Sequence, residues 1–577
     1  MKKLHIVALL GVAFAVLGLP LGAAGQEDAA TAEPAASADT EEPQYGGTLT
    51  LRRIDSTPVN ADATVSRSPA MHAAGPVLEH LTRVDYWRVG PRGSGEWSNT
   101  WVVCPEWVMT GNLAESWTAE PNRLTFNIRP GVFWQAMGKE HVMESRELTA
   151  DDIVASFTRI LDSGVALIQW TDNGGWVREV YASGDSVVFE LSQFSSTWPY
   201  VIGAGWMNAI YAPETVEAGI GDWENMVGTG PFIFEERVEG SHISYVRNPD
   251  YWDTTIINGT EYEVPFIDRL VYATIDDQST QLAALRTGKL DMFYRMSSKF
   301  EETLSKTNPD LNKVSNPWDW GYQLALRTDV APLNNKEIRR ALMMALDIPA
   351  INKAVVFGEG GDYHSYPVHS IIPYTHVALE DLPAQTRELW DFDPERAKQI
   401  LAEQGYPDGM TLSGVAQGSN SEVLVAAKGY WEQIGVEVNI DVVENAIMGR
   451  MFWAGEDNDY QVGYRGMGQA DALDAMQMYL GGHNWNWTRW DNPQFNQMWH
   501  DAVAALDTDE RNSIIRDLSV MALDSVAYIP IGTGRELQYW WPWVRNYYGE
   551  LHTADRTSGR FEADIWIDQN LKSQMGF

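Results

Sequence analysis

The sequence contains a single cysteine, Cys104, among its 577 residues. One thiol cannot form an intramolecular disulfide, nor a zinc or iron–sulfur site built from clustered cysteines. Basic residues are also scarce, since 42 Lys and Arg stand against 79 Asp and Glu, and the formal net charge is −37. This charge excludes nucleic acid and anionic membrane surfaces as expected partners, because both would be repelled.

Motifs of common enzyme and cofactor sites are absent or incomplete. Gly288-Lys289 resembles the end of a phosphate-binding loop, but Ala283 replaces its first glycine and Leu290 its final Ser or Thr. Gly466-Met467-Gly468 lacks the third glycine of a dinucleotide-binding turn, and neither HExxH nor GxSxG occurs. We therefore expect no enzymatic activity, no catalytic residue and no cofactor.

Three histidines, His364, His369 and His376, fall in one proline-containing segment beside Asp362. Imidazole binds nickel, copper and zinc, so such a segment is able to hold a metal. Their spacings of five and seven residues, however, do not place the rings on one helix face. The pattern favours solvated or hydrogen-bonded loop histidines, and we predict no metal site.

The first 25 residues carry the pattern of a secretory signal peptide. Lys2-Lys3 precedes an apolar run over 6–19 and a small-residue exit at 22–24. The run is shorter than the roughly 20 residues of a membrane span, so we expect cleavage and export without membrane insertion. No cysteine follows the run, so a lipid anchor is not expected. Residues 26–44 are rich in Ala, Pro and acids, which predicts a disordered leader.

From residue 45 onward, short apolar runs alternate with amphipathic segments, which is typical of an α/β or α+β protein. Thr149, Asn335 and Asp393 are predicted to cap helices, the first as part of a capping box. Two further helices are predicted over 492–506 and 509–523. The predicted strands are Gly47–Arg52, Leu124–Ile128, Ser186–Leu191, His242–Arg247, Arg269–Thr274, Tyr322–Arg327 and Val436–Val442.

Tryptophan is frequent, with 25 residues, and it gathers in clusters. Core packing accounts for a single indole, whereas exposed indoles form apolar plates that stack on peptide side chains or sugar rings. The segment HNWNWTRW, residues 483–490, is difficult to place wholly in a core. Both explanations fit the pattern, and our hypothesis is that at least one of these tryptophans lines a ligand site.

Nine segments occur in an order that is specific as a series, although each is weak alone. They are YGGTLTL (45–51), NLAESWTAEPNRLTFNIRPGVFWQ (112–135), LTADDIVASFTRIL (148–161), VGTGPFIFEE (227–236), YVRNPDYWD (245–253), LAALRTGKLDM (282–292), NNKEIRRALMMALDIPAI (334–351), DPERAKQILAEQGYPDG (393–409) and IGVEVNI (434–440). In these segments the chain resembles the family 5 bacterial extracellular solute-binding proteins, the receptors of dipeptide, oligopeptide and nickel ABC importers.

The resemblance implies an α/β periplasmic-binding-protein-like fold (type II, cluster C) with two lobes, a hinge of crossing strands and an extra inserted domain. Such proteins close around a ligand held between the lobes, and the membrane permease recognises the closed form. We expect lobe I to contain residues 45–80, 212–295 and 546–577, the inserted domain residues 81–211, and lobe II residues 296–545.

The resemblance also implies where the α-amino group of a peptide binds. Peptide-binding members pair it with an aspartate, and within 460–476 Asp471 is the best match and Asp474 the next. A desolvated ammonium needs a charge-assisted partner, which a carboxylate supplies. Arg465 stands where oligopeptide-binding members carry an arginine, although Asp471 could instead be a helix cap or turn residue. The remaining predicted ligand-binding residues are Trp485, Trp487 and Trp320.

These observations together predict a monomeric periplasmic receptor of an ABC importer that captures oligopeptides unchanged. An oligosaccharide receptor of the same family is one alternative, because a Trp-rich insertion over 86–111, together with a second insertion after Trp134-Gln135, would reshape a site for sugar stacking. A secreted hydrolase is the alternative from another class, since so acidic a chain can supply two facing carboxylates. The expected partners are the peptide or oligosaccharide ligand and the importer's permease.

Overall fold

The computed structural model describes residues 42–52, 57–85, 108–163, 176–205, 208–317, 321–355, 364, 366–370, 372–418, 421–444, 447–448, 450–451, 460–467, 472–550 and 559–577. The predicted signal peptide, almost all of the predicted leader, and Cys104 lie outside these residues. Within them, no helix combines the length and the apolar character that crossing a bilayer requires.

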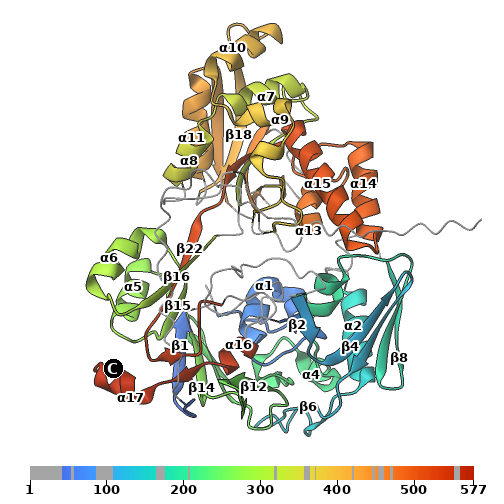
Figure 1. Cartoon of the computed structure of the whole chain (residues 1–577), viewed down its shortest axis with the longest axis vertical. Helices are drawn as coiled ribbons and strands as arrows, with labels where there is room; N and C mark the ends of the chain where they lie inside the picture. Colours follow the sequence, from blue (N-terminus) through green and yellow to red (C-terminus); the bar gives the residue numbers. More distant parts are fainter. Residues whose placement is uncertain are drawn as a thin grey trace, which may run out of the picture. The chain divides into compact units, whose positions relative to one another are not determined.

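Seven strands form the largest sheet: β1 (Thr48–Arg52), β10 (Phe232–Val238), β11 (His242–Arg247), β14 (Arg269–Ala273), β15 (Met292–Met296), β16 (Asn312–Pro317) and β22 (Arg535–Trp540). Their order is β10-β11-β14-β1-β15-β22-β16. The central strand β1 is parallel to β14 and β15, whereas the outer pairs are antiparallel. This is a mixed sheet assembled from both halves of the sequence (Figure 1).

Five strands form the second sheet: β17 (Gly321–Leu326), β18 (Met410–Gln417), β19 (Val436–Val443), β20 (Val462–Met467) and β21 (Tyr528–Gly532). In the order β19-β18-β20-β17-β21, β18 is parallel to both neighbours and β17 is antiparallel to both. Leu324 and Leu326 of β17 belong to one buried cluster and Ala325 to another, because alternate side chains point to opposite faces.

Each of these two clusters is completed by its own helices. The Leu324 cluster contains residues from α7 (Lys336–Met344), α8 (Ile348–Val355), α10 (Pro394–Glu403) and α11 (Ser421–Glu432). The Ala325 cluster contains residues from α13 (Ala472–Met476), α14 (Pro493–Ala504) and α15 (Thr508–Ser525). The second sheet is therefore buried on both faces.

A third, antiparallel sheet has the order β4-β5-β9-β8, formed by β4 (Ala114–Glu120), β5 (Arg123–Ile128), β8 (Val177–Ser183) and β9 (Ser186–Leu191). Helix α2 (Ala150–Asp162) packs against β8 and β9. The short pairs are β2 (Thr82–Val84) with β3 (Met109–Gly111), β6 (Phe133–Trp134) with β7 (Arg146–Glu147), β12 (Thr254–Ile257) with β13 (Thr260–Glu263), and β23 (Val544–Arg545) with β24 (Trp566–Ile567).

The remaining helices of the described residues are short, apart from α1. They are α1 (Ala63–Ala74), α4 (Pro213–Gly219), α5 (Gln278–Arg286), α6 (Glu301–Thr307), α9 (Ala384–Arg387), α16 (Gly559–Ala563) and α17 (Gln569–Gln574). The π-helix η2 (Pro199–Ala204) and the 3₁₀ turns η3 (Trp223–Asn225), η4 (Ser298–Phe300), η5 (Leu379–Asp381), η6 (Glu388–Trp390) and η9 (Gln477–Tyr479) complete the set.

The chain passes between the two larger sheets along one antiparallel ribbon. β16 pairs with β22 in the seven-stranded sheet, and β17 pairs with β21 in the five-stranded one, with Pro317 opposite Arg535 and Tyr322 opposite Gly532. Two bodies joined by crossing strands are what the sequence predicts. β16 and β22 fall inside the range predicted as lobe II yet pair in the larger sheet, and the predicted domain boundaries remain a proposal.

Local sequence signals locate the elements accurately. Thr149 Oγ1 accepts a hydrogen bond from the Asp152 N–H at 3.4 Å, and the Asp152 carboxylate accepts one from the Thr149 N–H at 2.9 Å. This reciprocal pair is the predicted capping box. Asn335 caps α7 and Asp393 caps α10, as predicted. The bounds of the seven predicted strands lie within one residue of those observed.

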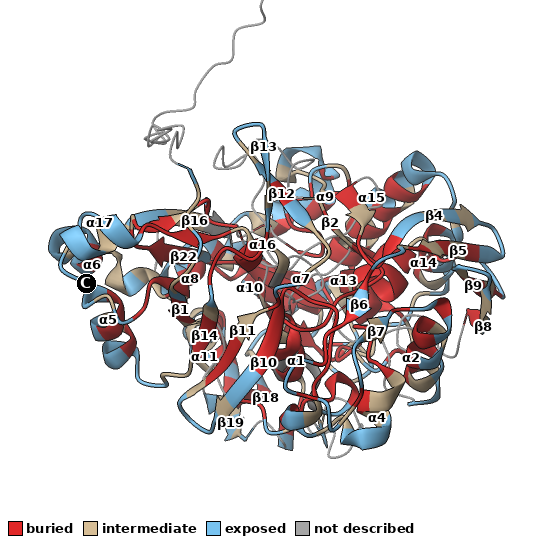
Figure 2. Ribbon diagram, turned by 90° about the horizontal axis from the view of Figure 1, so that it is seen from below, coloured by how far each residue is buried: buried red, intermediate tan, exposed pale blue. Residues whose placement is uncertain are grey.

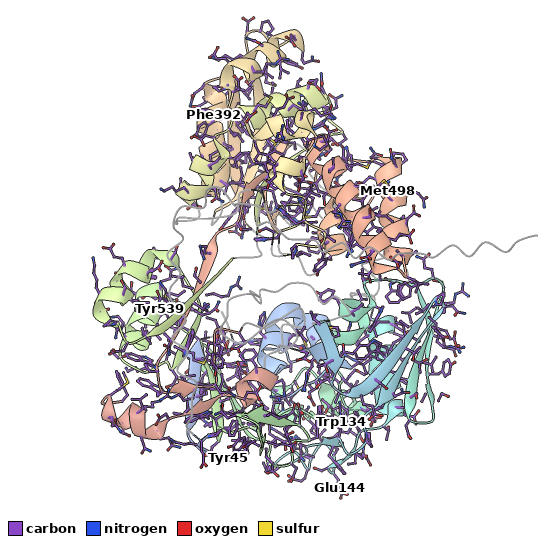
Figure 3. All side chains as sticks on the ribbon, in the orientation of Figure 1. Tyr45, Trp134, Glu144, Phe392, Met498 and Tyr539 are labelled. Atoms are coloured by element: carbon purple, nitrogen blue, oxygen red, sulfur yellow. The ribbon has the colours of Figure 1, made fainter. Side chains whose placement is uncertain are left out.

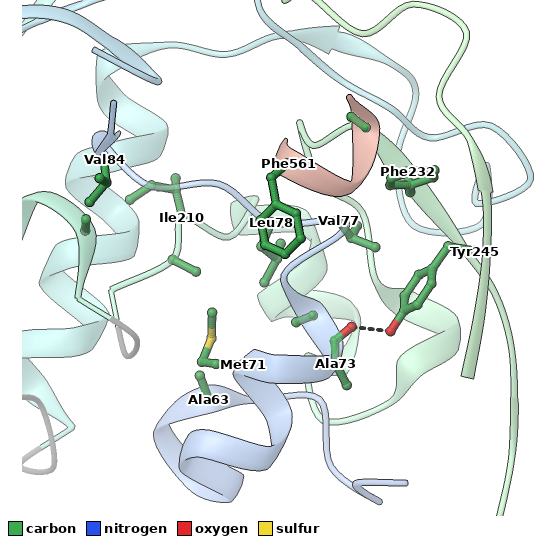
Figure 4. Close-up of a cluster of buried hydrophobic side chains, with 14 of the residues drawn as sticks. Ala63, Met71, Ala73, Val77, Leu78, Val84, Ile210, Phe232, Tyr245 and Phe561 are labelled. Carbon is green, nitrogen blue, oxygen red and sulfur yellow. Dashed lines mark hydrogen bonds between the residues drawn. The ribbon is translucent and has the colours of Figure 1, made fainter. Parts of the chain in front are cut away.

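The buried Asp291 connects distant parts of the chain around the largest sheet. One carboxylate oxygen accepts hydrogen bonds from Trp543 Nε1 and Lys572 Nζ, both at 2.7 Å, and the other accepts from the Thr50 N–H at 2.8 Å. The carboxylate thereby attaches α17 to β1, although α17 itself contains no buried residue (Figure 2). The hydrophobic core of the largest sheet also includes Trp134 (Figure 3) and Tyr245. The Tyr245 hydroxyl donates a hydrogen bond to the Ala73 carbonyl (Figure 4).

His80 lies in this core with 2% of its surface exposed. Burial lowers the pKa of His80 to about 4, against an ordinary value of 6.5. The unfolded chain therefore binds the His80 proton more tightly than the folded chain. Above pH 6.5 the free energy of unfolding carries no penalty from His80. It falls by about 3 kcal/mol as the pH drops from 6.5 to 4, because the unfolded chain takes up the proton first.

We expect the variant His80→Gln to lose less stability than the wild type between pH 6.5 and 4, because glutamine has no proton to gain in this range. Urea unfolding followed at several pH values in that window measures the difference. Parallel curves for the two proteins would show that His80 does not cause the acid sensitivity.

Candidate functional site

The residues predicted to bind ligand begin at the end of β20. The backbone of Arg465 stands opposite Gln323 of β17 in the antiparallel register. Gly466 and Met467 stand opposite Tyr322 and Gly321, the first residues of β17 after the chain enters the second sheet. The topology thus brings the Arg465 position to the edge of the sheet where the chain crosses between the two bodies.

The other predicted residues are only partly placed. Asp471, Trp320 and the side chain of Arg465 lie outside the described residues. Asp474 lies in α13 and is partly exposed, and α13 packs against α14 and α15. The ligand contacts of these residues remain proposals.

The segment of Trp485 and Trp487 is held against the second sheet by two tyrosine hydroxyls. The Trp487 carbonyl accepts a hydrogen bond from Tyr460 Oη at 3.0 Å, and the Trp487 N–H donates to Tyr528 Oη at 3.1 Å. Tyr528 Oη in turn donates to the Met478 carbonyl at 3.4 Å. The Trp487 side chain is 8% exposed, whereas Trp485 is half-buried, so Trp485 offers the larger surface for a ligand.

The same segment is fastened to the end of β17 that lies away from the crossing. The Thr488 carbonyl accepts hydrogen bonds from Thr328 N–H at 2.8 Å and from Thr328 Oγ1 at 3.1 Å. Thr328 lies five positions after Gln323, the position opposite Arg465, and two positions after the end of β17 at Leu326.

A charged pair supports Tyr460 beneath the tryptophan segment. The Arg327 guanidinium lies 5.1 Å from the centroid of the Tyr460 ring and binds both carboxylate oxygens of Asp329, at 2.7 and 2.8 Å. Burial raises the pKa of Tyr460. Burial also acts to raise the pKa of Asp329, but the bonds from Arg327 hold it below its ordinary value. The phenol therefore stays protonated and able to donate at neutral pH.

The histidine segment is hydrogen-bonded, in agreement with its interpretation as a loop. His364 Nε2 and His376 Nδ1 bond the carbonyls of Val377 and Val368, each at 2.8 Å. His369 Nε2 lies 3.3 Å from Thr533 Oγ1 in the segment between β21 and β22. No group of three or more His, Cys, Asp or Glu side chains in the described part of the chain is arranged to hold a metal ion.

A second connection joins the predicted inserted domain to the predicted lobe II. The Ser196 N–H donates to the Val503 carbonyl at 2.7 Å, and Ser196 Oγ donates to the Ala502 carbonyl at 3.1 Å. Arg511 Nε donates to Ser196 Oγ at 3.1 Å. Ser196 therefore binds the last turn of α14 and the first turn of α15, far from the crossing ribbon in sequence.

Sequence reasoning missed two features of this region. Tyr460 and Tyr528 were not identified as anchors of the tryptophan segment, since nothing in their local sequence indicates a partner. Gln323 was also missed, although a polar residue within the apolar strand GYQLAL is a signal that could have been used.

Residues 108–489 match the sequence model of a protein family described as bacterial extracellular solute-binding proteins, family 5 Middle. Heme-binding protein A of Haemophilus influenzae is 27% identical over 451 residues, covering 73% of this chain and 78% of that protein. Probable di/tripeptide-binding protein 5 of Pseudomonas aeruginosa is 24% identical over 73% of this chain and 81% of its own. The structure of the oligopeptide-binding protein AppA from Bacillus subtilis, in complex with a nonapeptide, superposes with a TM-score of 0.66 and 20% identity, covering 92% of this chain and all of that one.

Removing the hydroxyl that holds the Trp487 carbonyl tests how firmly the tryptophan segment is fixed. We expect Tyr460→Phe to lower the free energy of unfolding by about 1 to 2 kcal/mol, because a buried carbonyl loses its donor. Amide hydrogen exchange over residues 485–490 should also become faster. The control is Tyr430→Phe on α11, where the ring packs on Phe392 at 5.7 Å and little change is expected. Unchanged exchange in Tyr460→Phe would show that the segment is fixed by other contacts.

Proposed function

The chain belongs to the family 5 bacterial extracellular solute-binding proteins, and we propose that it captures oligopeptides for an ABC importer. The observation that carries the proposal is the family match over residues 108–489, which spans the third sheet and most of the second. Relatives named as di/tripeptide-binding proteins and a solved relative holding a nonapeptide support a peptide ligand.

The crossing ribbon supports binding by hinge closure. Small backbone rotations between β16 and β17, and between β21 and β22, would turn the second sheet relative to the first without breaking either sheet. A ligand shifts this equilibrium only by binding the closed form more tightly than the open one. The closed form would then be recognised by the permease.

Peptide recognition would combine one charged contact with main-chain contacts. We assign the ligand ammonium to Asp471, with Asp474 as the second match, and an additional polar contact to Arg465. Trp485, Trp487 and Trp320 would contact ligand side chains. The Arg465 position and the Trp487 segment lie towards opposite ends of β17, which favours peptides of several residues over dipeptides.

Export and release complete the proposal. Residues 1–25 would be removed as a signal peptide, and the absence of a cysteine after the apolar run would leave the protein without a lipid anchor. It would act as a monomer and return its ligand chemically unchanged.

Mass spectrometry of small molecules released by denaturing the purified protein tests the ligand class. We expect a mixture of short peptides. Finding only oligosaccharides, or a haem Soret band in the absorption spectrum of the native protein, would contradict the peptide proposal. Appearance of cleavage products when the protein is incubated with peptides would contradict binding without chemistry.

A second experiment tests the ammonium site. Asp471→Ala should lower the affinity for peptides that have a free N-terminus by about a hundredfold, and should lower the affinity for N-acetylated peptides much less. Isothermal titration calorimetry measures both affinities, with Asp474→Ala as the matched control. Equal losses for both peptide forms would make Asp471 a structural residue, and a larger loss in Asp474→Ala would move the ammonium site to that carboxylate.

A further inference from the structure

Gln323 is a fully buried side-chain amide in the middle of the second sheet, with 0% of its surface exposed. Neither Nε2 nor Oε1 has a hydrogen-bond partner among the described residues. A buried amide that lacks both a donor and an acceptor is rare in folded proteins, because each unsatisfied group costs about 1 to 3 kcal/mol. The unpaired Gln323 amide therefore lowers the free energy of unfolding of the ligand-free protein.

The surroundings of Gln323 do not relieve this cost. By the alternation along β17, Gln323 shares its face with Ala325, and β18 and β21 contribute Val415 and Tyr528 to the same apolar cluster. Its register partner on β21 is Pro530, which has no N–H group. A leucine or methionine would fit such a face without leaving polar atoms unpaired.

A second glutamine nearby shows that this sheet can satisfy an amide fully. Gln461 immediately precedes β20, and its Oε1 accepts a hydrogen bond from the Ser413 N–H at 2.9 Å. Its Nε2 donates to the Ala331 carbonyl at 2.8 Å. The two glutamines differ in that the Gln461 amide is bonded to Ser413 of β18 and to Ala331, whereas the Gln323 amide has no hydrogen-bond partner among the described residues.

We propose that Gln323 is a specificity residue whose unpaired amide receives a peptide group of the bound oligopeptide. This inference rests on the proposed peptide-binding function and names a residue of the same site. Gln323 is the third residue of β17 after the crossing and stands opposite Arg465, at the edge where hinge closure would bring the two bodies together. A side-chain amide offers N–H donors and a C=O acceptor side by side, which match the C=O and the N–H that one residue of an extended peptide presents on the same side.

The proposal predicts opposite effects on stability and binding in one variant. Gln323→Met removes two unsatisfied polar atoms at nearly constant volume, so the ligand-free protein should melt about 2 to 5 °C higher. The same variant should bind tetra-alanine about tenfold more weakly, because a buried hydrogen bond to the ligand is lost. The control Gln461→Met should melt at a lower temperature and keep the affinity of the wild type.

A ligand-side change separates direct contact from an indirect effect. Tetra-alanine is methylated on one backbone nitrogen at a time, and each form is titrated into wild type and Gln323→Met by calorimetry. Methylation at one position should lower the affinity for wild type about tenfold and the affinity for the variant only a little. This non-additivity marks two directly coupled groups in a double-mutant cycle. Losses that are equal in both proteins at all positions, or a lower melting temperature for Gln323→Met with unchanged affinity, would overturn the proposal.

The two proposals fail in different ways. If wild type binds no alanine peptide and releases no peptides on denaturation, the proposed function is wrong. If wild type binds peptides and Gln323→Met binds them equally well, the function stands and the role of Gln323 is wrong.

Discussion

The antiparallel ribbon that runs from β16 and β22 into β17 and β21 is the constraint on which the structure depends. Backbone hydrogen bonds keep the ribbon paired within each sheet, so both crossing segments are anchored at both of their ends. In the proposed function, a few backbone torsions between the two sheets would turn one body relative to the other. A solute-binding protein needs both properties, because it must close and reopen without unfolding.

The ribbon also decides what surrounds the candidate site. β17 is the strand that enters the second sheet, and β20 pairs with it so that the Arg465 position lies beside the crossing. Both faces of this sheet are covered by helices, so a polar side chain on β17 is enclosed unless it faces the crossing edge. Gln323, near the end of β17 at the crossing, is buried with no hydrogen-bond partner among the described residues, while the Trp487 segment is fastened beyond the other end of the strand.

Local chemistry explains why so much of the fold could be read from the sequence. Thr149 with Asp152, Asn335 and Asp393 cap their helices through atoms only two or three residues away, and a residue type at a fixed spacing is enough to predict such contacts. Strand bounds follow from runs of apolar residues, because burial favours them wherever the sheet lies. Family membership follows from nine such segments in series, each of them mainly structural.

The site was less accessible to sequence reasoning because its contacts join distant residues. Trp487 was identified from the density of tryptophan in HNWNWTRW, but its burial depends on Tyr460 and Tyr528, 27 and 41 residues away. Sequence alone therefore determined the caps, the strands, the family and the net charge. Only the tertiary structure decided which polar atoms are paired, because hydrogen-bond partners are set by proximity in space and not by spacing in the sequence. Gln323 and Gln461 are the same residue type, yet among the described residues only the Gln461 amide has hydrogen-bond partners.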